Sequence, residues 1–220
     1  MTVLLCLTGE SATVTPPVTV TRASHRGWTN AWTLGNGLVE AVVVPGAPVL
    51  RIVTRYDKVA GDPVEVGVWV ITQVADPVAV FLPVPASSRY PSGTTTNWGV
   101  PSGVLTRSGD VLRLTRDPVA SHKIGNDAGS VAWVGRREVL RIDGPRVAGG
   151  IYGDDGCSME VYTNPDPVPY VELETLGPQR RLAPGDWIAA TNTYVLFRRV
   201  LADDEAEARR VLSSSNPAER

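Results

Sequence analysis

The sequence predicts an all-β protein, an antiparallel β-sandwich with one short helix near its C-terminus. The chain has 33 Val, 19 Thr and 6 Ile among 220 residues, and β-branched side chains favour strands over helices. Gly and Pro occur 21 and 18 times, which suits many short strands joined by turns. The composition, 43% hydrophobic and 20% charged, is typical of a globular chain. We expect one sandwich domain over residues 1–212 and a polar tail over 213–220.

Apolar and polar residues alternate with a period of two along most of the chain, and turn residues bound each alternating segment. Pro45-Gly46, Gly61-Asp62-Pro63 and Asp76-Pro77 are examples of such turns. More than ten mainly antiparallel strands are therefore expected. The predicted strands are 18–22, 38–44, 49–56, 64–74, 78–84, 111–115, 131–134, 138–142, 159–163, 170–175 and 191–198.

Two segments depart from this alternation. Residues 89–103 are polar and rich in Gly, Ser, Thr and Pro, which predicts a long surface loop with Trp98 inside it. Residues 202–212 contain Ala, Glu and Arg at a density that favours a helix, and Asp203 or Asp204 is placed to cap its N-terminus.

Charge and missing motifs exclude several functions. The net charge of −2 is spread along the chain, so we expect neither a nucleic-acid nor a membrane partner. Phosphate-binding glycine motifs are absent, and His25 and His122 lie far apart, so we expect no metal and no organic cofactor. Cys6 and Cys157 are predicted to stay unbridged. We recognise no export signal and no apolar span, which indicates a cytoplasmic protein.

Segment 170–175 carries the sharpest candidate site. Alternation places Val171 and Leu173 on one face of a strand, and Glu172 and Glu174 together on the other. Two carboxylates about 7 Å apart raise one another's pKa, as a general acid or base near neutral pH requires. A solvated outer face is the alternative explanation.

Lysine and tryptophan supply further candidates. Lys123, one of two lysines, lies in segment 122–127, which we interpret as a polar turn; a cluster that binds hydroxyls or a carboxylate is the alternative. Six tryptophans against two phenylalanines suggest indoles that pack on sugar rings. Trp69 and Trp133 lie in apolar strands, where core packing is the simpler interpretation, whereas Trp98 in the loop suits binding equally well.

Six blocks of sequence follow one another along the chain: 27–40, 68–74, 123–127, 159–164, 170–178 and 182–185. Together they resemble the bacterial DUF4380 proteins, which are related to galactose mutarotase and the aldose 1-epimerases. The W-x-I-T-Q and E-L-E-T-L-G-P blocks are the most specific parts of this resemblance.

This resemblance implies a galactose mutarotase-like β-supersandwich whose concave face binds carbohydrate, in a shortened member of the group. It also implies that Glu174 is the general base and His122 the acid of a catalytic pair. The candidate substrate-binding residues, from the resemblance and from the patterns above, are Glu172, Lys123, Trp69, Gln73, Trp98 and Arg51.

The first functional hypothesis is a carbohydrate-binding protein that also acts on the anomeric centre of an aldose. In that reaction Glu174 takes the proton from O1 while His122 or Lys123 assists at the ring oxygen. The alternatives are a non-catalytic sugar-binding module and a structural or oligomerising β-sandwich. Catalysis requires Glu172 or Glu174 to meet His122 in one cleft, whereas a module needs only the aromatic platform.

Overall fold

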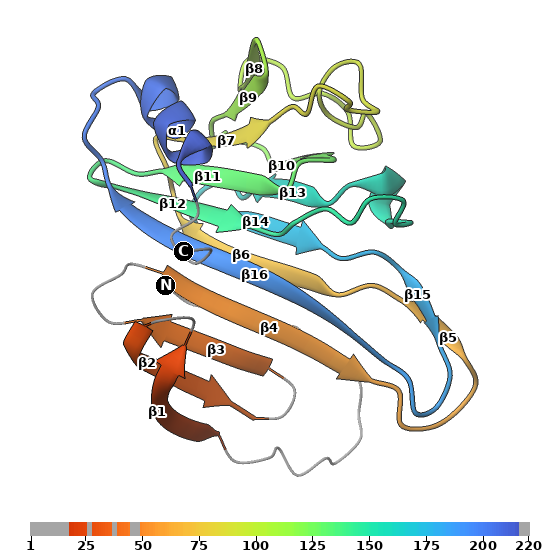
Figure 1. The fold of residues 1–220 in the computed structure, drawn as a ribbon. Helices are drawn as coiled ribbons and strands as arrows, with labels where there is room; N and C mark the ends of the chain where they lie inside the picture. Colours follow the sequence, from red (N-terminus) through yellow and green to blue (C-terminus); the bar gives the residue numbers. More distant parts are fainter. Residues whose placement is uncertain (1–17, 26–27, 37–38, 45–48, 216–220) are drawn as a thin grey trace.

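The computed structural model describes residues 18–25, 28–36, 39–44 and 49–215, and these residues form two packed antiparallel sheets (Figure 1). Sixteen strands and one α-helix lie within them, which confirms the predicted all-β class. The large sheet has ten strands in the order β1-β2-β3-β4-β16-β12-β11-β7-β9-β8. In that order their bounds are Thr19–His25, Trp28–Gly35, Val39–Val44, Val49–Asp57, Trp187–Arg198, Glu138–Asp143, Ser130–Val134, Ala79–Pro83, Val111–Leu114 and Leu105–Ser108.

The small sheet has four strands in the order β10-β13-β14-β6. Their bounds are His122–Asn126, Met159–Thr163, Tyr170–Leu176 and Trp69–Ala75. A separate ribbon pairs β15 (Arg180–Leu182) with β5 (Val64–Val66), and it projects from one end of the sandwich (Figure 1). Every strand pairing among the described residues is antiparallel.

The main hydrophobic core lies between the two sheets. Leu82 and Ile142 of the large sheet pack in one cluster with Val161 and Leu173 of the small sheet, and each of these side chains is at most 1% exposed. Because side chains alternate along a strand, the residues next to Val161 and Leu173 point away from this core.

The predicted C-terminal helix is confirmed as α1 (Asp204–Ser213), close to the predicted range 202–212. Asp203 caps it, since its side chain accepts a hydrogen bond from the Ala206 N–H at 2.7 Å. The helix lies against the large sheet at β7 and β11 (Figure 1). Val211 and neighbouring apolar residues of the helix pack in one cluster with residues of these strands.

Several strand predictions need correction. The single predicted strand 64–74 is wrong, because the chain leaves the ribbon after β5, passes Gly67 and joins the small sheet as β6. Strand β16 begins at Trp187, ahead of its predicted start at residue 191. Strands β2, β8 and β15 are absent from the predicted set, because their sequences lack a clear alternation of apolar and polar residues.

The region around β10 also differs from the prediction. Segment 122–127 is mostly strand and not a turn. Loop 89–103 contains no strand, as expected, but Thr94 and Thr95 are only 2% and 1% exposed. The Thr95 N–H and the Thr94 hydroxyl both donate to the Gly125 carbonyl, at 2.8 and 2.9 Å, and so dock the loop on β10.

Cys157 is a buried free thiol, and Cys6 lies outside the described residues. Within the described part of the chain, no helix is long and apolar enough to cross a membrane.

Candidate functional site

Most candidate residues lie on the side of the small sheet that faces away from the core. Val161 and Leu173 point into the core, so Glu160 and Glu174 point to the opposite side, which we name the outer face. The strand register pairs Glu160 of β13 with Glu174 of β14, and it pairs Glu174 with Ile71 of β6. Glu172 lies two residues from Glu174 in the same strand, and so on the predicted common face.

A second line of neighbours crosses the outer face. Lys123 pairs with Tyr162, Tyr162 with Glu172, and Glu172 with Gln73, so that each strand of the small sheet contributes one residue. All four side chains are partly exposed. We name these four residues the polar row. Its ammonium, phenol, carboxylate and amide groups can donate hydrogen bonds to a ligand or accept hydrogen bonds from it.

Lys123 is surrounded by charged and aromatic groups. Its Nζ lies 2.8 Å from Glu160 Oε2 and 3.2 Å from Glu174 Oε2. The same atom lies 5.0 Å from the ring centroid of Trp69 and 4.9 Å from that of Trp98, which are cation–π distances. The Trp69 indole N–H donates to Glu174 Oε2 at 2.8 Å. We name these five side chains the Lys123 cluster.

The Lys123 cluster has a buried layer and an exposed layer. Glu160 and Glu174 are 0% and 1% exposed, whereas Trp69 and Trp98 are 47% and 40% exposed. The interpretation of Trp69 as a core residue is therefore wrong, because β6 turns only one of its faces to the core. The two indoles and the polar row face solvent. Beneath them, the buried carboxyls of Glu160 and Glu174 both contact Lys123, and Glu174 also accepts the hydrogen bond from Trp69.

Gly125 makes room for Trp98 above β10. A Cβ atom on Gly125 would lie 3.2 Å from Trp98 Cζ3, 2.9 Å from Glu160 Cγ and 2.8 Å from Cys157 Sγ. Loop 89–103 can therefore place the Trp98 indole on the outer face because β10 has a glycine, with no side chain, at position 125.

Gly125→Ala is expected to lower the free energy of unfolding by about 1–3 kcal/mol, because the added methyl group clashes with Cys157 Sγ and Glu160 Cγ, and to shift the tryptophan emission spectrum, because it also displaces Trp98. Gly129→Ala is the matched control, since its Cβ would meet its nearest neighbours at 3.7 Å or more. Urea unfolding and fluorescence spectra measure both effects, and equal behaviour of the two variants would contradict this placement of Trp98.

Burial and charge change the acidity of the site. Burial raises the pKa of Glu160 to about 8, although Lys123 lowers it. Burial also raises the pKa of Glu172, with a further contribution from the charge of Glu174. For Lys123, burial lowers the pKa, but the contacts with Glu160 and Glu174 outweigh it and the pKa is raised.

The structure does not bring His122 and Arg51 to this site. His122 adjoins Lys123 in β10 and lies opposite Thr163, so it belongs to the core-facing side of the sheet, where it contacts Asp117 at 3.0 Å. Arg51 lies in β4 of the large sheet and donates to the Thr191 hydroxyl at 3.4 Å. The predicted pair of Glu174 and His122 is thus separated by the small sheet.

Two residues of the site were missed by the sequence predictions. Glu160 and Tyr162 alternate with Val161 in the predicted strand 159–163, which is the pattern that singled out Glu172 and Glu174. The same rule of alternation would have placed both residues on the outer face.

In the described ranges, no group of three or more His, Cys, Asp or Glu residues could hold a metal ion.

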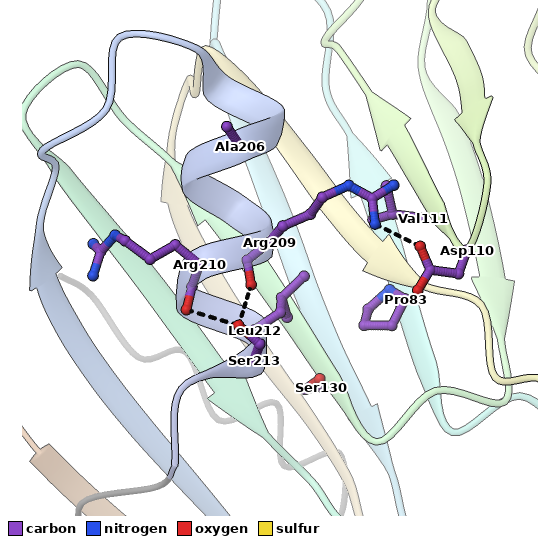
Figure 2. Close-up of a pocket in the computed structure, with 9 residues that line it drawn as sticks. All are labelled: Pro83, Asp110, Val111, Ser130, Ala206, Arg209, Arg210, Leu212 and Ser213. Atoms are coloured by element: carbon purple, nitrogen blue, oxygen red, sulfur yellow. Dashed lines mark hydrogen bonds and ion pairs between the residues drawn. The ribbon is translucent and has the colours of Figure 1, made fainter.

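A separate hollow of about 590 Å³ lies between α1 and the large sheet (Figure 2). Arg209 extends across it to Asp110 at 2.5 Å and also pairs with Glu205 at 2.9 Å. The Ser213 hydroxyl donates to the Arg209 carbonyl at 2.8 Å. The Arg209 cation is therefore already paired with carboxylates of the chain itself.

The two-sheet architecture is the galactose mutarotase-like sandwich fold. A candidate aldose 1-epimerase from Escherichia coli K12 matches it with a TM-score of 0.50 and 12% identity, over 82% of this chain and 68% of that chain. A galactose mutarotase-like protein from Lactobacillus casei has a TM-score of 0.46 and 10% identity, over 82% of this chain and 73% of that chain. At 12% identity the likeness to the Escherichia coli structure establishes the fold alone. No protein-family model and no curated protein matches the sequence.

Proposed function

We propose that the protein binds a carbohydrate on the outer face of the small sheet. The observation that carries this proposal is the pair of partly exposed indoles, Trp69 and Trp98, whose ring centroids lie 5.0 and 4.9 Å from the Lys123 ammonium. An indole face packs on the apolar face of a sugar ring, and polar groups beside it orient the hydroxyls. Here the polar row, which includes Glu172 and Gln73, supplies those groups.

The fold and the sequence resemblance support the same ligand class. The Escherichia coli structure with this fold is described as a candidate aldose 1-epimerase, whose substrate class is an aldose. We also propose that the chain is a shortened relative of the DUF4380 proteins. The W-x-I-T-Q block that carries this resemblance contains Trp69 and Gln73, and both residues lie on the outer face.

A second candidate function is ring opening at the anomeric carbon of an aldose. Glu174 accepts both of its hydrogen bonds, from Trp69 and Lys123, on Oε2, which leaves Oε1 to take a proton from O1. Lys123, and not His122, would then assist at the ring oxygen, because Lys123 adjoins Glu174. A sugar must displace an indole to reach Oε1, since Glu174 is 1% exposed.

Glycan-array binding of the purified protein, followed by polarimetry on each bound sugar, tests both functions. We expect Trp98→Ala to weaken binding of the sugar found on the array by about tenfold or more. Trp187→Ala is the matched control, because Trp187 is 49% exposed but lies in β16 of the large sheet. No bound glycan, or equal affinities of the two variants, would overturn the proposed site. Mutarotation that persists in Glu174→Gln would overturn the second candidate.

A further inference from the structure

The carboxyl of Glu160 has no part in the function proposed above. Its side chain is 0% exposed and lies between Gly125 of β10 and Glu174 of β14. Oε2 lies at an ion-pair distance of 2.8 Å from Lys123 Nζ, but neither of the two buried carboxyl oxygens has a hydrogen-bond partner among the described residues. Burying a carboxyl without hydrogen bonds costs free energy, so the ion pair with Lys123 is the interaction that can compensate for the burial of Glu160.

We propose that Glu160 is a positioning residue of the candidate site: its carboxyl anchors the Lys123 ammonium beside Glu174 and within cation–π distance of the two indoles. A lysine side chain is long and flexible, so its ammonium keeps one position only when several groups hold it. Glu160 and Glu174 reach Nζ from neighbouring strands at 2.8 and 3.2 Å. Glu174 Oε2 also accepts a hydrogen bond from Trp69, whereas the ion pair with Lys123 is the only polar contact of the Glu160 carboxyl among the described residues.

The strength of this anchor depends on pH. The titratable groups that face Glu160 are Lys123 from β10, Glu174 from β14, and Asp154 and the Cys157 thiol from the segment before β13. Burial raises the pKa of Glu160 to about 8 and that of Cys157 to about 12, so Glu160 ionises first. Once Glu160 ionises, it attracts the ammonium more strongly, and we expect Nζ to move away from Glu174.

The presence of only two lysines makes the position of the ammonium measurable without a ligand. Protein labelled with carbon-13 at lysine Cε gives NMR signals for Lys58 and Lys123, and Lys58→Arg assigns them. Ring currents of two indoles at 5.0 and 4.9 Å should displace the Lys123 Hε signals from those of Lys58. Between about pH 6 and pH 9.5 we expect the Lys123 signals to titrate with the midpoint of Glu160.

Glu160→Gln keeps the shape of the protonated carboxyl but cannot ionise. We expect its Lys123 signals to match those of the unsubstituted protein near pH 6 and to lose the titration. Undisplaced Lys123 signals in the unsubstituted protein, or a titration that persists in Glu160→Gln, would overturn the proposal. The first of these outcomes needs no substitution at Glu160, so the test does not depend on the folding of that variant.

The effect of this anchor on ligand affinity rests on the proposed function. We expect the affinity for a sugar identified on the array to differ between about pH 6.5 and pH 9.5 in the unsubstituted protein and to be constant in Glu160→Gln. Because the NMR titration uses ligand-free protein, a failure to bind any sugar overturns the proposed function, and the NMR titration still decides the role of Glu160. Sugar binding without the NMR titration overturns the role of Glu160 alone.

Discussion

Glu174→Gln should weaken sugar binding by about 10- to 100-fold, which corresponds to about 1–3 kcal/mol. The carboxylate accepts hydrogen bonds from Trp69 and Lys123 on one oxygen, and it holds both groups in place on the outer face. Glutamine keeps the shape of the side chain but loses its charge, so Lys123 is held less firmly. For a sugar that the protein also turns over, the rate should fall by about 10² to 10⁴, because the amide cannot take a proton. Isothermal titration calorimetry and polarimetry measure the two effects.

The control for this experiment is Glu65→Gln. Glu65 is an exposed carboxylate in β5 of the projecting ribbon, so the same loss of charge there should leave sugar binding unchanged. If Glu174→Gln alters neither affinity nor turnover for a verified ligand, Glu174 has no role in a sugar site.

Lys123→Met is expected to destabilise the protein by about 3–5 kcal/mol at pH 9, because it leaves two buried carboxyls without a cation. The effect should be smaller at pH 5. The pKa of Glu160 is raised above its ordinary value of 4.5, to about 8. The stability that Glu160 contributes is therefore fully present below pH 4.5 and is lost as the pH rises through about 8. Without Lys123 this loss is larger, because no cation offsets the ionised carboxyl.

Urea unfolding at pH 5, 7 and 9 measures this dependence. Lys58→Met is the matched control and should change the free energy of unfolding by no more than about 0.5 kcal/mol, as for most surface substitutions. Adding Glu160→Gln to Lys123→Met should restore much of the lost stability at pH 9, which a double-mutant cycle quantifies. A loss of equal size at every pH would contradict this account of the buried charges.

The faces of the late strands could be predicted from the sequence. Alternation in segment 170–175 correctly placed Glu172 and Glu174 together on the side opposite Leu173. The signal that singled them out was the repetition of a carboxylate within one strand. Glu160 has no such repeat in β13, since the next residue on its face is Tyr162, and it was overlooked although the same rule applies.

The environment of Lys123 could not be predicted, because it depends on contacts distant in sequence. Gly125 and Asn126 are typical of turns, but strand pairing with β13 overrides this local preference. Once the segment is a strand, His122 and Lys123 necessarily point to opposite faces. The proximity of Trp98 follows from the docking of loop 89–103 on the Gly125 carbonyl, and the Thr94 contact that docks it joins residues 31 positions apart, beyond the reach of local sequence patterns.

The position of β16 in the large sheet has a consequence for the synthesis of the chain. Strand β4 and strand β12 are both complete long before Trp187–Arg198 is made, yet β16 lies between them and pairs with each. As the polypeptide leaves the ribosome, the strand meander β1–β4 and the meander containing β11 and β12 therefore each keep one unpaired edge facing the gap. The final strand joins the two halves through contacts of very high sequence separation, which favours slow folding and makes the nascent chain dependent on protection from aggregation.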